Sequence, residues 1–109
     1  MSAFLSELFD LQGRVAVVIG GGGHLCSEMA RGFARAGCAV AVLDLRLDKA
    51  VKVEEELRAL GCERVTSIAI DVAKKQDHVD SLEQILEVFD QVDILVNGAG
   101  INAPTPFLE

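Results

Sequence analysis

Four short apolar runs, rich in β-branched residues, recur along the 109-residue chain. They are RVAVVI at 14–19, CAVAVLDL at 38–45, RVTSIAI at 64–70 and VDILVN at 92–97. Continuous apolar runs of this length are typical of parallel strands that are buried on both faces of a sheet. The pattern therefore predicts four core strands.

Segments with helical spacing of apolar residues lie between these runs. The first begins after the glycines at 20–23 and ends near Gly37, the second spans about 48–60 and stops at Gly61, and the third spans about 76–90. The residues expected to face the core are Leu25, Met29, Phe33 and Ala34 in the first helix, Ala50, Val53, Leu57 and Leu60 in the second, and Val79, Leu82, Ile85, Leu86 and Phe89 in the third.

The order of these elements is strand, helix, strand, helix, strand, helix, strand. Such an alternation predicts a doubly wound α/β fold, with a parallel sheet, right-handed crossovers and helices on both faces. The two prolines, Pro104 and Pro106, both follow the fourth strand, and no internal linker or repeat is evident. We therefore expect residues 1–109 to form a single domain.

Four consecutive glycines, at 20–23, join the first strand to the first helix. A helix that starts at such a turn presents unpaired N–H groups and the positive end of its dipole, both of which favour a phosphate. The spacing Gly21-x-Gly23-x-x-Cys26 nearly satisfies the dinucleotide pattern GxGxxG of a Rossmann-type fold. The alternative is a glycine turn that serves packing alone.

Asp44 closes the second strand, where a carboxylate can accept both hydroxyls of an adenosine ribose. A carboxylate at this point would repel a 2′-phosphate, so NAD is favoured over NADP, although Arg46 could pair with such a phosphate. An ordinary solvated acid at the end of a strand is the alternative for Asp44.

The charge and the cysteine content exclude several classes of protein. Seventeen acidic and ten basic residues give a net charge of −7, which argues against a nucleic-acid or anionic membrane surface and favours small-molecule partners. The N-terminus lacks the features of a signal peptide and no run is long enough to span a membrane, so a cytoplasmic location is expected. Cys26, Cys38 and Cys62 form no CxxC pair, which favours reduced core thiols over disulfides or a zinc site.

Several stretches together resemble the N-terminal part of a short-chain dehydrogenase/reductase. They are FDLQGRVAVVIGGGG at 9–23, VLDL at 42–45, AIDVA at 69–73 and VDILVNGAGINAPTPF at 92–107, and they cover nearly the whole chain. In this chain, Ile19-Gly20-x-x-x-His24-Leu25-Cys26 corresponds to the family's TGxxxGxG loop. Of the three glycines in that pattern, only the first is present, as Gly20. GGGGHLC is similar to the GGGGxLC loop of a subgroup that resembles D-mannonate oxidoreductases, also called fructuronate reductases.

The resemblance adds contacts to the cofactor site. It implies that Asp71-Val72 lies against the adenine, and that NGAG at 97–100, in place of the family's NNAG, passes close to a cofactor ribose while Asn97 bonds across the sheet centre. Asp71 could also cap the following turn, His24 could bond a phosphate or only pack at the surface, and His78 is expected to be a surface residue. The candidate cofactor-binding residues are Gly20, Gly21, Gly22, Gly23, His24, Leu25, Asp44, Asp71, Val72, Asn97, Gly98 and Ala99.

The resemblance also implies an activity. The family interconverts a hydroxyl and a carbonyl with NAD(P), using serine, tyrosine and lysine, and the subgroup points to a sugar acid as the substrate. This chain contains no tyrosine, so no catalytic residue is assigned. We expect a truncated, inactive cofactor-binding part of an enzyme whose parent chain is a homo-oligomer. The alternatives are a nucleotide-binding or interaction module without chemistry, or a partial gene product without a function.

Overall fold

A computed structural model describes residues 3–99 of the chain. The elements follow one another as α1 (Ala3–Leu8), β1 (Val15–Ile19), α2 (His24–Arg35), β2 (Ala39–Asp44), α3 (Leu47–Ala59), β3 (Val65–Ala69), α4 (Lys75–Phe89) and β4 (Ile94–Asn97). All four strands and the three helices between them lie where the sequence predicts them, and α1 is an addition. Within residues 3–99, no helix is both long enough and apolar enough to cross a membrane.

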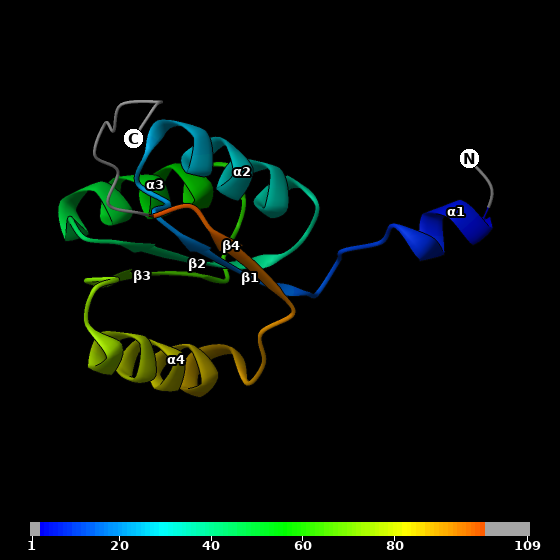
Figure 1. The fold of residues 1–109 in the computed structure, drawn as a ribbon. Coiled ribbons are helices and arrows are strands. Elements are labelled where there is room, and N and C mark those ends of the chain that lie inside the picture. Colours follow the sequence, from blue (N-terminus) through cyan, green and yellow to red (C-terminus); the bar gives the residue numbers. More distant parts are fainter. Residues whose placement is uncertain (1–2, 100–109) are drawn as a thin grey trace, which may run out of the picture.

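The four strands form one parallel sheet in the order β3-β2-β1-β4. Helices α2 and α3 cover one face of the sheet, α4 lies on the other, and α1 stands away from the sheet (Figure 1). This arrangement confirms the predicted doubly wound α/β fold. The chain leaves β1 toward β2 and β3 but returns to place β4 on the opposite side of β1. Ligands of such sheets bind at this switch, beyond the carboxyl ends of the strands.

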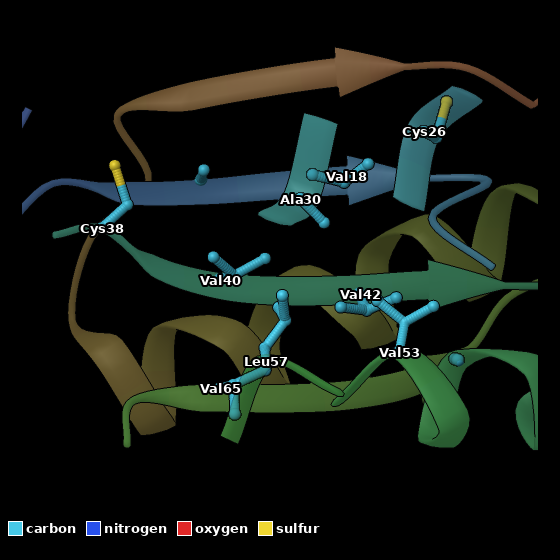
Figure 2. Close-up of a cluster of buried hydrophobic side chains, with 11 residues drawn as sticks. Val18, Cys26, Ala30, Cys38, Val40, Val42, Val53, Leu57 and Val65 are labelled. Carbon is cyan, nitrogen blue, oxygen red and sulfur yellow. The ribbon is translucent and has the colours of Figure 1, made fainter. Parts of the chain in front are cut away.

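The core is centred on β1 and β2. Val15–Ile19 and Ala39–Leu43 are buried throughout, whereas β3 and β4 are partly exposed at the two edges of the sheet. One apolar cluster lies between the sheet and α2 and α3 (Figure 2), and the second, which includes Ile85 and Phe89, lies beneath α4. Each fully buried valine or leucine contributes roughly 1.5–3 kcal/mol, so the two central strands dominate the stability of the sheet.

The buried face of α2 differs from the predicted one. Its buried residues are Cys26, Ser27 and Ala30, while Leu25 is 67% and Met29 is 40% exposed. Phe33 and Ala34 pack against the core as expected. Small side chains on the sheet-facing side let the first turns of α2 approach β1 and the glycine loop closely, which turns the larger apolar residues outward.

The predictions for α3 and α4 are also wrong for four of their apolar residues. Leu60 is the C-cap of α3 and is exposed, whereas Ala50, Val53 and Leu57 are buried as predicted. Val79, Leu82 and Leu86 are exposed on α4, which uses Ile85, Phe89 and Ser81 for its buried face. The apolar stripe of α4 is therefore wider than the part of the sheet that the described chain places beneath it.

The predicted helix stops are confirmed. Gly37 and Gly61 follow the C-caps of α2 and α3 with φ of +91° and +97°, a conformation that strongly favours glycine. In each case the next residue closes the turn: the Cys38 N–H donates to Phe33 O and the Cys62 N–H to Leu57 O, both at 3.0 Å. Each helix is thereby directed into the next strand.

Candidate functional site

The glycine loop at 20–23 leaves the carboxyl end of β1 and enters α2. The N–H groups of Gly20 and Gly21 donate to Leu43 O at 2.7 and 3.0 Å, and that of Gly23 donates to Gly20 O at 3.0 Å. The Gly22 N–H donates to Asp44 Oδ2 at 3.0 Å. All four glycine N–H groups are therefore used inside the protein, and the loop itself offers no free backbone donor.

The free donors lie one step further along the chain. The backbone N–H groups of His24, Leu25 and Cys26, in the first turn of α2, have no hydrogen-bond partner within residues 3–99. Unpaired N–H groups at the start of a helix, together with the helix dipole, make a site for an anion such as a phosphate. The anion site at the start of α2 stays a prediction, and the backbone donors available to it belong to the residues that follow the glycines.

The first three glycines are required by their surroundings. Gly20 has φ of +81°, and a Cβ there would lie 3.0 Å from Gly98 C. A Cβ on Gly21 would lie 2.8 Å from Val42 Cγ1, and one on Gly22 would lie 2.7 Å from Lys49 Cβ. Gly23 has φ of −76°, and its Cβ would meet only Gly20 O, at 3.2 Å. A side chain is thus excluded at three of the four positions.

Asp44 ends β2 beside the glycine loop, as predicted. Its Oδ2 accepts the Gly22 N–H and its Oδ1 accepts the Arg46 N–H, each at 3.0 Å. These bonds fix the carboxylate and leave each oxygen a further lone pair for another donor. The Arg46 guanidinium is mostly exposed and pairs with Asp48 at 3.4 Å, so it does not neutralise Asp44 through a direct contact.

The loop after β3 holds the second predicted acid. Asp71 Oδ1 accepts the Ala73 N–H at 3.0 Å, which confirms the turn-capping role, while the Asp71 N–H donates to Asp77 Oδ2 at 2.8 Å. The exposed His78 ring contacts Val72 O through Nε2 at 2.9 Å and so braces this loop. The Val72 N–H has no partner in the described part of the chain.

A cavity of about 170 Å³ at the carboxyl ends of the strands is lined by five of the twelve candidate cofactor-binding residues. Asp44 and Asp71 are its acidic lining residues, and Leu45 and Ile70, which the sequence analysis did not select, are apolar ones. Leu45 and Ile70 each lie beside a predicted acid, which is the signal that could have identified them. The lining residues are Gly20, Asp44, Leu45, Ile70, Asp71, Val72 and Ala99.

The end of β4 approaches the glycine loop closely. The Gly98 N–H donates to Ile19 O at 3.0 Å, and the backbone of Gly98 and Ala99 lies against Gly20. Asn97 is exposed on the edge strand, and within residues 3–99 its side chain makes no hydrogen bond. The predicted bond of Asn97 across the sheet centre is therefore absent here, because β4 has no neighbour on its outer side in the described sheet.

His24 lies apart from the cavity that holds Asp44 and Asp71. It lines a second cavity of about 250 Å³ between α2 and α3, together with the cationic residues Arg31, Lys49 and Lys52. Arg31 bonds Ser27 Oγ at 3.3 Å and pairs with Glu28 and Glu56. The side chain of His24 thus lies beside the loop, while its backbone N–H is one of the three unpaired N–H groups at the start of α2. No group of three or more side chains suited to hold a metal occurs in the described residues.

The sequence matches the short chain dehydrogenase family over residues 14–109, and the chain belongs to that family. It is 42% identical over 95 residues to the uncharacterized oxidoreductase UxuB of Bacillus subtilis (strain 168), a match that covers 87% of this chain and 34% of that protein. This chain therefore spans about a third of the length of that relative.

Solved structures agree with this membership. A hydroxysteroid dehydrogenase from Escherichia coli is similar with a TM-score of 0.86 and 33% identity, over 94% of this chain and 43% of that one. A candidate D-mannonate oxidoreductase from Haemophilus influenza, solved with bound NAD, is similar with a TM-score of 0.81 and 31% identity, over 92% of this chain and 35% of that one. The expected family and the expected Rossmann-type fold are confirmed.

Proposed function

We propose that this chain is the cofactor-binding part of an NAD-dependent oxidoreductase that interconverts a hydroxyl and a carbonyl. The observation that carries the proposal is the pairing of three free N–H groups at the start of α2 with a cavity that presents Asp44 and Asp71. A dinucleotide needs both features, because its pyrophosphate is an anion and its adenosine is a flat group with polar edges. Family membership supports the same conclusion.

The residues present fit an adenosine diphosphate group. The N–H groups of His24, Leu25 and Cys26 would bind the pyrophosphate, and the free lone pairs of Asp44 would accept the ribose hydroxyls. At the adenine, the free Val72 N–H can donate to a ring nitrogen and Asp71 can accept from the amino group. Leu45 and Ile70 would contact the ring faces.

The same arrangement favours NAD over NADP. A 2′-phosphate would meet the Asp44 carboxylate, which is fixed by two backbone bonds and has no cation paired directly with it within residues 3–99. The nearest basic candidate, Arg46, is exposed and paired with Asp48. The repulsion would therefore persist when NADP binds.

When bound, the nicotinamide would accept or supply the hydride that such a reaction requires. The described residues would bind and orient the cofactor, and the absence of side chains at Gly20 and Gly98 lets the ends of β1 and β4 approach each other closely. Reduction of a carbonyl also needs a positioned acid. We assign that role to no residue of this chain, which contains no tyrosine.

For the substrate we propose a sugar acid. The support is the resemblance of the GGGGHLC loop to the mannonate oxidoreductase-like subgroup and the similarity, at 31% identity, to the Haemophilus influenza protein named for D-mannonate. The described cavity contains only residues expected to face the adenosine end of a cofactor, so the proposal for the substrate rests on these likenesses.

The test is a titration of the protein with NADH and with NADPH, followed by calorimetry. We expect NADH to bind at least about tenfold more tightly than NADPH, and Asp44→Ala to weaken NADH binding by about tenfold or more. Asp80→Ala, which removes an exposed acid of α4, is the matched control and should leave both affinities unchanged. Equal binding of the two cofactors would overturn the NAD assignment, and the absence of binding would overturn the proposed function.

A further inference from the structure

Cys38 and Cys62 occupy equivalent positions in two successive helix-to-strand turns. Each follows a glycine of positive φ, and each donates its N–H to a carbonyl five residues back in the preceding helix, at 3.0 Å. Cys38 leads into β2 and Cys62 into β3, which are neighbouring parallel strands. The repeated turn therefore places both thiols at the amino ends of two neighbouring strands.

The two cysteines lie within reach of each other. Cys62 Sγ is 3.7 Å from Cys38 O, which by standard covalent geometry puts this sulfur within roughly 6 Å of Cys38 Cα. The parallel register begins with Val40 opposite Val65, at a strand spacing of about 4.8 Å, and Cys38 and Cys62 precede this pair by two and three residues. A disulfide requires Cα atoms about 4.4–6.8 Å apart, and the approach of Cys62 Sγ to Cys38 O brings the two cysteines toward that separation.

A cavity of about 270 Å³ is lined by both cysteines. Cys38 Sγ currently contacts Leu11 O at 3.4 Å, so its side chain must rotate about the Cα–Cβ bond to meet Cys62. The cavity supplies space for that rotation and for the approach of a small oxidant. The other lining residues are Ala34, Gly37, Ala39, Gly61, Glu63 and Arg64.

The third cysteine is excluded by its position. Figure 2 shows Cys26 and Cys38 at opposite ends of the buried cluster, and Cys26 lies in the first turn of α2 beside the end of β1. The six residues of β2 lie between the amino ends of the strands, where Cys38 is found, and their carboxyl ends, where Cys26 is found. A strand of six residues is about 20 Å long. Only one of the three pairings is therefore compatible with the fold.

We propose that Cys38 and Cys62 are the site of an intramolecular disulfide that forms when a peroxide oxidises the protein. A Cys62 thiolate attacks one oxygen of the peroxide, so that an S–O bond forms, the O–O bond breaks and the other oxygen leaves as water after protonation. Cys38 then attacks the sulfenic sulfur, forming the S–S bond and breaking the S–O bond, and its thiol proton leaves with the oxygen as a second water. Two thiols are oxidised and one hydrogen peroxide is reduced to two waters.

The surroundings of the two thiols assign these roles. Cys62 is the more exposed, and although burial raises its pKa, the nearby Arg58 and Arg64 and the hydrogen bond at Arg64 oppose that rise. Burial also raises the pKa of the Cys38 thiol, and the nearby charge of Asp93 raises it further. Cys62 is therefore the first to be oxidised and Cys38 the residue that resolves it, in a reaction that becomes faster as the pH rises.

The experiment is peroxide treatment of the folded protein, followed by trypsin digestion without reduction and mass spectrometry. Cleavage after arginine places Cys38 in peptide 36–46, Cys62 in peptide 59–64 and Cys26 in peptide 15–31. We expect 36–46 joined to 59–64, at the summed mass less two hydrogen atoms, and we expect dithiothreitol to separate them. Unfolded protein should instead give all three pairings.

Variants separate this proposal from a general sensitivity to oxidation. Cys26→Ser should keep the linked pair, whereas Cys62→Ser, at the half-exposed position, should abolish it while the protein still folds. Linkage of peptide 15–31 in the folded protein, dimers joined through cysteine, or irreversible oxidation of Cys62 without a link would each overturn the proposal. The outcome is independent of cofactor binding, because the proposed cofactor site lies at the carboxyl ends of the strands and the two cysteines lie at the amino ends.

Discussion

Cys26 fills the space that a side chain at position 98 would occupy. A Cβ placed on Gly98 would overlap Cys26 Sγ, and it would also lie 3.1 Å from Ile19 O. Cys26 belongs to the first turn of α2 and Gly98 follows β4, so this contact sets how closely α2 and the end of β4 approach each other. The two positions should therefore be coupled in their effect on stability.

We expect Gly98→Ala to destabilise the protein by about 1–3 kcal/mol, because the new methyl group overpacks a tight site. Cys26→Ala should restore much of this loss in the double variant, since the Cβ of residue 26 lies at an ordinary 3.7 Å from the new methyl group. The coupling is measured as the difference between the free energy of unfolding of the double variant and the sum of the two single effects.

Gly32→Ala is the matched control for this cycle. Gly32 lies within α2 and its Cβ would meet nothing within 4 Å, so the change should stabilise the helix by about 0.5–1 kcal/mol whichever residue stands at position 26. Additive effects of Gly98→Ala and Cys26→Ala would contradict the coupling.

The glycine loop should tolerate a side chain at its last position but not at Gly22. Gly22→Ala would force the methyl group against Lys49 Cβ and Asp44 Oδ2, at 2.7 and 2.9 Å, and so break the bond that fixes Asp44. We expect about a tenfold or greater loss of NADH affinity in a calorimetric titration. Gly23→Ala, with φ of −76° and one contact at 3.2 Å, should change the affinity much less. Equal losses would show that the loop needs glycine at both positions.

Much of the fold could be predicted because its signals are local. Continuous apolar runs identify strands buried on both faces, and Gly37 and Gly61 end their helices because φ near +90° strongly favours glycine. The position of Asp44 could be predicted for the same reason, since the end of a parallel strand is set by the length of its apolar run. Five of the twelve candidate cofactor-binding residues line one cavity, and their part in cofactor binding stays a prediction; they are Gly20, Asp44, Asp71, Val72 and Ala99.

The remaining features depend on which surfaces meet in three dimensions. Leu25 and Met29 have the spacing of a core face, but the close approach of α2 to β1 selects Cys26 and Ala30 instead. Likewise, all four loop glycines are candidate cofactor-binding residues in the sequence, yet neighbouring carbonyls and Asp44 use all of their N–H groups. Neither choice can be read from periodicity, because both depend on partners distant in the sequence.

Acid should weaken the junction between β1 and β4 through Asp93. Its carboxylate accepts the Val15 N–H at 2.8 Å and the Gln91 amide at 2.7 Å and lies 3.5 Å from Arg14. The backbone bond from Val15, more than the other two partners, lowers the pKa of Asp93 below its ordinary value. A lowered pKa in the folded state means that this contribution is fully present above the unfolded pKa and is lost as the pH falls through the folded one.

We therefore expect Asp93→Asn to destabilise the protein near neutral pH and to make the fall in stability below about pH 4 less steep than in the parent. Urea unfolding over a series of pH values measures both effects. Glu83→Gln removes one exposed charge of α4 and serves as the control for net charge. If the two variants had the same acid profile, the stabilisation could not be assigned to the bonds of Asp93.

The apolar surface beside β4 should cause the protein to associate with itself. Val79, Leu82 and Leu86 of α4 and Leu95 of β4 are exposed together with the outer edge of β4, and Leu82 and Leu95 line one cavity of about 170 Å³. Exposed apolar surface and an unpaired strand edge both promote association.

We expect Leu82→Gln with Leu86→Gln to lower the average mass seen by light scattering, at unchanged circular dichroism. Leu60→Gln changes an equally exposed leucine at the end of α3, away from β4, and should leave the mass unchanged. A parent protein that is already monomeric, or an equal effect of Leu60→Gln, would show that the surface beside β4 does not drive association. Because both sets of leucines are exposed, their burial in the fold cannot explain a difference between the variants.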